Sequence, residues 1–151
     1  LIIAGDGSGR QHLQRKAAAL LRNRVVFAGK IPRDELFRYY SAADIFAFPG
    51  IEESLGMVYL EAQSCKLPVV AYSDWGGGEA VIHGRTGLLS PATEQSRFTD
   101  NIQYLLKEPI RRQALAINAG EHIRRNHDIV ANYRLLEEKL VAVSRKLSGN
   151  K

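Results

Sequence analysis

The stretch that decides the fold is Pro49-Gly50-Ile51-Glu52-Glu53-Ser54-Leu55-Gly56-Met57-Val58-Tyr59-Leu60-Glu61-Ala62. The apolar run 45–48 precedes it and predicts a strand. A helical pattern follows, and it predicts one apolar face made of Leu55, Val58, Ala62 and Cys65. The segment therefore indicates strand, turn and helix, with Glu53 in the turn and Glu61 on the helix. In α/β sheets, a helix that starts at the carboxyl end of a strand is a frequent site for phosphate-bearing ligands.

The spacing of the two acids suits an extended ligand. Glu61 follows Ser54 by seven positions, so both lie on nearly the same helix face, roughly 10 Å apart along the axis. A diphosphate over the helix N-terminus would bring a ribose within reach of Glu61 and a sugar within reach of Glu53. The backbone N–H groups that lack a helical partner at this end are those of Leu55, Gly56, Met57 and Val58. Taken alone, the pattern favours a simpler interpretation, in which Glu53 and Ser54 only cap the helix and Glu61 is a solvated surface residue.

Short apolar runs alternate with helical patterns along the rest of the chain. The predicted strands are residues 1–4, 25–28, 45–48, 69–72 and 87–90. The predicted helices are residues 9–21, 34–42, 55–64 and 79–82, one from about 98 that ends near Pro109, and a C-terminal helical segment of about 110–147. Leu13, Ala17, Leu20 and Leu21 are expected to face inward. This alternation predicts an α/β fold, a three-layer Rossmann-like parallel sheet with helices on both faces.

Several of these segments together resemble glycosyltransferase family 4, whose enzymes have the GT-B fold. The family pattern contains Glu-Gly-Phe-Gly and a later Glu-Ala with seven residues between the glutamates, which is similar to the arrangement of Glu53 and Glu61. Four further segments match in family order: 26–31, 35–44, 67–71 and 84–89. The resemblance covers about residues 1–106 and only the C-terminal, donor-binding half of such an enzyme. The whole chain, residues 1–151, is therefore expected to be an N-terminally truncated nucleotide-sugar-binding domain.

The resemblance implies a retaining, metal-independent transfer from a UDP-, GDP- or ADP-sugar to an acceptor hydroxyl, without a cofactor. It implies that Glu53 binds the transferred sugar as the catalytic residue and that Glu61 binds the ribose. The expected donor-binding residues are Ser54, Leu55, Gly56, Met57, Val58 and Glu61, with Lys30 and Ile31 on the side of the base. An Arg and a Lys that neutralise the diphosphate, and the acceptor domain, would lie upstream of residue 1, so the isolated chain is expected to transfer little sugar.

Composition limits the partners and the kinds of site that the chain is expected to have. The net charge of +5 favours anionic partners, but acids interrupt the basic residues, so a nucleic-acid surface is not expected. A single cysteine, Cys65, excludes an internal disulfide and fits a reducing compartment. No Asp-x-Asp motif or Cys/His cluster indicates a metal. The expected location is cytoplasmic, and a peripheral place at the inner membrane face, inferred from family habits and the basic charge, stays open.

Two other functions stay open. A non-catalytic nucleotide-binding or interaction module could keep the fold without the transfer. A nicotinamide-dependent domain is suggested by Gly5-Asp6-Gly7-Ser8-Gly9, which follows a strand and precedes a helix. That turn lacks the third glycine at the fingerprint spacing, and no acid is evident at the end of the strand 25–28.

Overall fold

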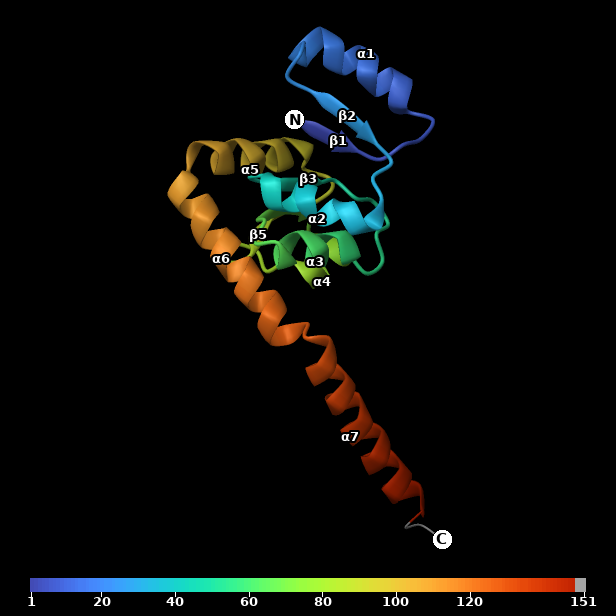
Figure 1. Ribbon diagram of the computed structural model, residues 1–151. Coiled ribbons are helices and arrows are strands. Elements are labelled where there is room, and N and C mark those ends of the chain that lie inside the picture. The colour runs from blue at the N-terminus through green and yellow to red at the C-terminus, as the bar shows by residue number, and fades with distance from the viewer. Residues whose placement is uncertain (149–151) are drawn as a thin grey trace. The chain divides into compact units, whose positions relative to one another are not determined.

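The computed structural model describes residues 1–148, with side chains as far as residue 145. The chain divides into two compact units, Leu1–Tyr39 and the part from Tyr40 on. Figure 1 follows the elements through both units. Helix α2 (Arg33–Ala42) spans the boundary between the two units.

The first unit is a βαβ arrangement. Strands β1 (Ile2–Ala4) and β2 (Val26–Gly29) pair in parallel, and α1 (Arg10–Leu21) connects them. Of the four α1 residues predicted to face inward, Ala17 is buried and Leu21 half-buried. The prediction was wrong for Leu13 and Leu20, whose side chains are 49% and 75% exposed. A sheet of two strands offers too little apolar surface to cover a whole helix face.

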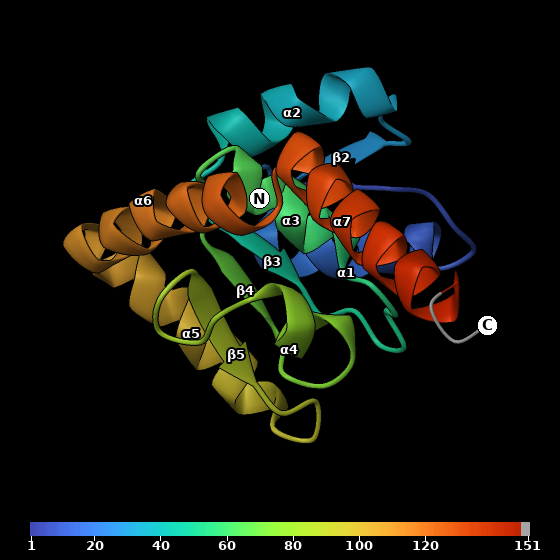
Figure 2. The same ribbon diagram turned by 90° about the horizontal axis from the view of Figure 1, so that it is seen from below.

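The second unit is built on a three-stranded parallel sheet in the order β3-β4-β5. Its strands are β3 (Phe46–Phe48), β4 (Val69–Tyr72) and β5 (Gly87–Ser90). Figure 2 shows the three side by side. The register pairs Phe48 with Ala71 and Tyr72 with Ser90, so all three strands end at the same edge of the sheet. The loops that leave this carboxyl edge carry the predicted site.

Helices cover both faces of this sheet (Figure 1). On one face, Val70 packs with Leu105 of α5 (Gln95–Lys107), and the Tyr72 ring lies 5.1 Å from that of Phe98. On the other face, α3 (Met57–Ser64) and α4 (Gly76–Ala80) lie against β4. Because successive side chains of a strand point to opposite faces, β4 serves both layers, and its four residues are buried.

Two long helices complete the second unit. Helix α6 (Pro109–Asn126) buries Leu115 and Ala119, and Leu115 joins the cluster around Val70. Helix α7 (Ile129–Ser148) follows. Its apolar residues Tyr133, Leu136, Leu140 and Val143 are exposed. None of the described helices is both long and apolar enough to cross a membrane.

The predicted α/β class with parallel strands and helices on both faces is confirmed. Within residues 1–148, five strands pair in two parallel sheets, β1-β2 and β3-β4-β5. The bounds of β4 and β5 are those predicted. Helix α4 begins earlier than the predicted 79–82. Gly77 in this helix packs closely on β4, because a Cβ there would lie 2.0 Å from the Tyr72 carbonyl oxygen.

The core on the α5 face yields a stability prediction. Leu105 is fully buried, whereas its neighbour Leu106 is 60% exposed. We expect Leu105→Ala to lower the free energy of unfolding by about 2–5 kcal/mol, because the substitution removes apolar contacts and leaves a cavity. Urea unfolding followed by circular dichroism measures this difference. Leu106→Ala is the matched control and should change stability by less than about 1 kcal/mol; equal losses in the two variants would contradict the packing described here.

Candidate donor-binding site

The turn 49–56 leads from β3 into α3 and owes its shape to one glycine. Gly56 precedes the helix in the left-handed conformation, with φ 66° and ψ 32°. A Cβ on Gly56 would lie 2.7 Å from the Gly76 carbonyl oxygen and 2.7 Å from the Tyr59 ring. Such distances are shorter than any real contact, so only glycine fits this position. The turn therefore lies directly against the start of α4.

Glu53 holds this turn from two sides. Its Oε1 accepts a hydrogen bond of 3.2 Å from the Gly56 N–H, and its backbone carbonyl accepts one of 2.6 Å from the Gly76 N–H. The carboxylate thus fixes the residue that precedes α3, while the helix itself receives no side-chain cap bond. This one bond still leaves a half-buried carboxylate with acceptor capacity for a hydroxyl.

The first turn of α3 offers amide donors beside Glu53. The Gly56 N–H is taken by Glu53. The N–H groups of Met57 and Val58 stand where the helix itself supplies no acceptor. Ser54 and Leu55 precede the helix and are exposed. Two backbone donors at a helix N-terminus suit a phosphate or a sugar oxygen.

The inward face of α3 differs from the predicted one. Its buried residues are Tyr59, Ala62 and Gln63. Leu55 lies outside the helix and is 71% exposed, while Val58 and Cys65 are half-buried. The prediction was therefore wrong for Leu55 and right for Ala62. The helix starts two residues later than predicted because Gly56 bends the chain, and this moves the face that meets the sheet.

Gln63 and Tyr59 are two site-supporting residues that the sequence analysis missed. Gln63 is fully buried, and its Nε2 donates to the carbonyl oxygens of Tyr59 (3.1 Å) and Ala80 (2.8 Å), which joins α3 to α4. The Tyr59 hydroxyl donates to the Phe48 carbonyl oxygen over 3.4 Å. Burial, reinforced by the negative charge of Glu53, raises the pKa of Tyr59. Tyrosine and glutamine in a helical pattern give no sign of burial, so no sequence signal pointed to them.

Glu61 lies on α3 next to a buried tyrosine. The Tyr40 hydroxyl donates to Glu61 Oε2 over a long 3.5 Å, and the Tyr40 ring packs edge-on against Phe46. Burial, with the charge and hydrogen bond of Glu61 as further causes, raises the pKa of Tyr40 to about 12. Tyr40 therefore remains a neutral donor that keeps the half-buried Glu61 carboxylate oriented.

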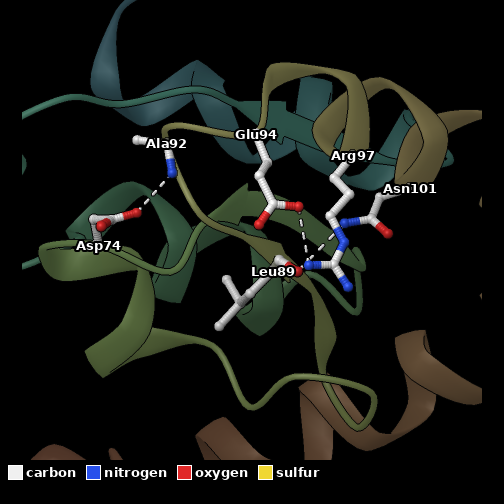
Figure 3. A network of polar contacts seen from close by, with 6 residues as sticks. All are labelled: Asp74, Leu89, Ala92, Glu94, Arg97 and Asn101. Carbon is white, nitrogen blue, oxygen red and sulfur yellow. Dashed lines mark hydrogen bonds and ion pairs between the residues drawn. The ribbon is translucent and has the colours of Figure 1, made fainter.

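The loops after β4 and β5 are tied to each other and to the Glu53 turn. The Asp74 carboxylate accepts a hydrogen bond of 2.7 Å from the Ala92 N–H (Figure 3). The Ser73 N–H donates to the Ser90 carbonyl oxygen (2.8 Å), and Asn101 Nδ2 donates to the Leu89 carbonyl oxygen (3.4 Å). Together with the bond between Gly76 and Glu53, these contacts link all three loops of the carboxyl edge.

Lys30 and Ile31 belong to the first unit, directly after the end of β2. Gly29 is buried there with φ 70°, and the Arg10 guanidinium nitrogen Nη1 lies 3.2 Å from where its Cβ would be. Lys30 is exposed and Ile31 half-buried. Within the described part of the chain, no group of three or more His, Cys, Asp or Glu side chains is arranged to hold a metal ion.

Comparison with known proteins identifies the family. Residues 1–122 match the model of the glycosyl transferases group 1. The chain belongs to this family. The prediction of glycosyltransferase family 4 and of its GT-B fold is thereby confirmed.

Two curated relatives of this group 1 chain carry glycosyltransferase names. This chain is 39% identical over 130 residues to the GDP-mannose-dependent alpha-(1-6)-phosphatidylinositol monomannoside mannosyltransferase of Mycolicibacterium smegmatis. The match covers 81% of this chain and 34% of the relative. The chain is 40% identical over 99 residues to the D-inositol 3-phosphate glycosyltransferase of Rhodococcus opacus, covering 66% of this chain and 22% of the relative. The group 1 chain thus spans about a third or less of these relatives.

A solved structure that contains UDP-glucose is also similar. Anabaena Alr3699/HepE in complex with UDP-glucose matches with a TM-score of 0.80 and 28% identity over 93% of this chain and 40% of that one. Within the group 1 chain, the carboxyl-edge turn joins Glu53 to the first turn of α3, and Glu61 follows on the same helix. Lys30 and Ile31 lie in the other unit.

The pKa of Tyr40 makes stability depend on pH. The folded chain keeps the phenol proton up to about pH 12, whereas an unfolded chain loses it near pH 10.0. The stability that Tyr40 contributes is therefore complete below pH 10 and is lost as the pH rises towards 12. We expect the free energy of unfolding of Tyr40→Phe to fall less steeply over this range, as measured by urea unfolding at stepped pH. Tyr133→Phe, at a residue 66% exposed, is the control and should follow the unsubstituted chain.

Proposed function

We propose that this chain is the nucleotide-sugar-binding part of a retaining, metal-independent glycosyltransferase that transfers a sugar to an acceptor hydroxyl. The observation that carries the proposal is the turn at the carboxyl edge, where the Glu53 carboxylate adjoins the first amides of α3. Membership of the glycosyl transferases group 1 and similarity to a UDP-glucose complex support it. Acceptor binding would need a further domain, since the chain spans 34% of the mannosyltransferase relative.

In this scheme the α3 amides receive the diphosphate. The N–H groups of Met57 and Val58 point partial positive charge to the place where negative charge grows on the leaving group. Their donors are fixed before the ligand arrives, because Gly56 and Gly76 lock the turn. Fixed donors need no reorganisation during the reaction, and this is the main advantage of a preorganised site.

The two glutamates take the two ends of the donor. Glu53 orients the transferred sugar through its hydroxyls, and Glu61 accepts hydrogen bonds from the ribose. Lys30 and Ile31 are proposed to serve the nucleobase side. The relatives name both a GDP-mannose-dependent and a UDP-glucose-bound protein. We take GDP-mannose as the first donor to test, because the mannosyltransferase relative has the higher identity, 39% against 28%. A peripheral place at a membrane would follow if the acceptor is a lipid.

Titration calorimetry of the chain with GDP, UDP, ADP and NAD tests the proposal. A nucleoside diphosphate should bind and NAD should not. We expect Glu61→Ala to weaken that binding by about tenfold to a hundredfold, since a hydrogen bond to a charged group contributes about 1.5–3 kcal/mol. Glu138→Ala, on an exposed part of α7, is the charge-matched control and should bind like the unsubstituted chain. If no nucleotide binds, or if both variants weaken alike, the proposed function is wrong.

Glu53 should act on the sugar rather than on the nucleotide. Glu53→Gln retains an oxygen that accepts from the Gly56 N–H, so the turn is preserved. We expect this variant to bind GDP as before and to lose at least fivefold in affinity for GDP-mannose, because an amide is a weaker acceptor than a carboxylate. Comparing the two ligands by calorimetry measures the effect. An equal loss for both ligands would place Glu53 in nucleotide binding or in capping alone.

A further inference from the structure

The opposite edge of the three-stranded sheet carries a cavity of about 350 Å³. It is lined by Ile82, Arg85, Asn118, Glu121, His122, Arg125 and Asn126. Ile82 and Arg85 belong to the loop that enters β5, and the other lining residues belong to α6. The cavity therefore lies at the amino ends of the strands, away from the turn that contains Glu53.

The loop that carries Arg85 is held in place by several bonds. The buried Thr86 hydroxyl accepts from the Ile82 N–H (3.0 Å), and the Arg85 N–H donates to the Ile82 carbonyl oxygen (3.0 Å). From α6, Arg111 Nη2 donates to the Gly84 carbonyl oxygen over 2.6 Å. His83 Nδ1 accepts from the Leu89 N–H (2.9 Å). The backbone of Arg85 is thus fixed relative to α6 without using its guanidinium.

The cavity lining is rich in hydrogen-bond donors. Arg85 forms no ion pair with any residue in the described part of the chain. Arg125 lies 3.3 Å from Glu121, the only carboxylate in the lining, and so neutralises it. His122 Nδ1 lies 2.9 Å from Asn126 Nδ2, an amide donor, so the ring proton resides on Nε2. Two guanidiniums, an imidazole N–H and the Asn118 amide remain as donors.

The electrostatic balance of the cavity is positive. With His122 neutral, Arg85 and Arg125 against Glu121 leave one net positive charge. Burial, His127 and Arg85 all lower the pKa of His122, and the His127 ring lies 5.4 Å from it. A positive, donor-rich concavity of this kind is the chemistry that recognises a phosphate oxyanion.

We propose that this cavity binds a phosphate group through Arg85, Arg125 and His122, at a site separate from the donor turn. The group is carried either by a small phosphate ester or by the head of a phospholipid, since both present the same oxygens. Arg85 supplies the uncompensated charge, and Arg125 turns from Glu121 to the ligand. The proposal does not depend on the proposed function, because no residue of the donor turn lines the cavity.

The test follows the His122 imidazole resonances by NMR while inorganic phosphate replaces chloride at constant ionic strength near neutral pH. His122→Asn assigns the signal among the four histidines. We expect a saturable shift that Arg85→Gln weakens at least fivefold. Glu121→Gln should act in the opposite direction and tighten binding at least threefold, because it removes the competing carboxylate and frees Arg125.

The control variants use a second surface ion pair, which lies outside the cavity and resembles the pair of Arg125 and Glu121. Arg97 and Glu94 lie 3.0 Å apart on the surface at α5, as Arg125 and Glu121 do on α6. Arg97→Gln and Glu94→Gln change the net charge equally and should leave the phosphate titration unchanged. An unmoved His122 signal, or shifts that follow net charge in all four variants, would overturn the proposal. Because Arg85 is exposed, we expect the Arg85→Gln variant to fold, and its melting curve checks this.

A vesicle experiment then distinguishes the two sources of phosphate. The chain is sedimented with vesicles of phosphatidylcholine alone or mixed with phosphatidylinositol. Sedimentation that requires phosphatidylinositol and is lost in Arg85→Gln assigns a lipid head group. Binding of inorganic phosphate without such sedimentation assigns a small phosphate ester. Either result supports the site, whereas sedimentation that Arg85→Gln and Arg97→Gln weaken alike shows general charge attraction and counts against it.

Discussion

The carboxyl edge of the second unit depends on one close approach between two backbone segments. Gly56 and Gly76 come so near that a Cβ on either would lie 2.7 Å from backbone atoms of the other segment. A hydrogen bond of 2.6 Å from the Gly76 N–H to the Glu53 carbonyl oxygen closes the contact. Any larger residue would separate the turn after β3 from the start of α4. The positions of Glu53 and of the first α3 amides therefore depend on glycine, which has no side chain, at both Gly56 and Gly76.

Hydrogen bonds between the loops after β4 and β5 also make the carboxyl edge rigid. Asp74 binds the Ala92 amide and Ser73 binds the Ser90 carbonyl, so the loop after β4 is held between its neighbours. A site that must orient a flexible nucleotide sugar benefits from such rigidity, because the cost of ordering is met during folding rather than at binding. The buried Gln63, which joins α3 to α4, extends this support below the surface.

The sequence predicted those parts of the structure that depend on local pattern. Strands β4 and β5 were predicted at their true bounds because each is a short apolar run between turn residues. The family and the GT-B fold followed from motif order. The helix faces were less predictable: Leu20 and Leu55 are exposed although they fit a helical stripe. Burial of a helix face depends on what the rest of the chain packs against it, and periodicity alone does not contain that information.

The residues that support the sites were harder to find for a related reason. Gln63 bonds to Ala80, and Arg85 approaches His122, across long separations in sequence. The two proposed sites would attract anions by different means. Backbone amides at the carboxyl edge carry partial charge and suit a diphosphate that must leave after the transfer, whereas the guanidiniums at the amino edge carry full charge and suit a phosphate that stays bound. A parallel sheet makes this division possible, because all its strands end at one edge and begin at the other.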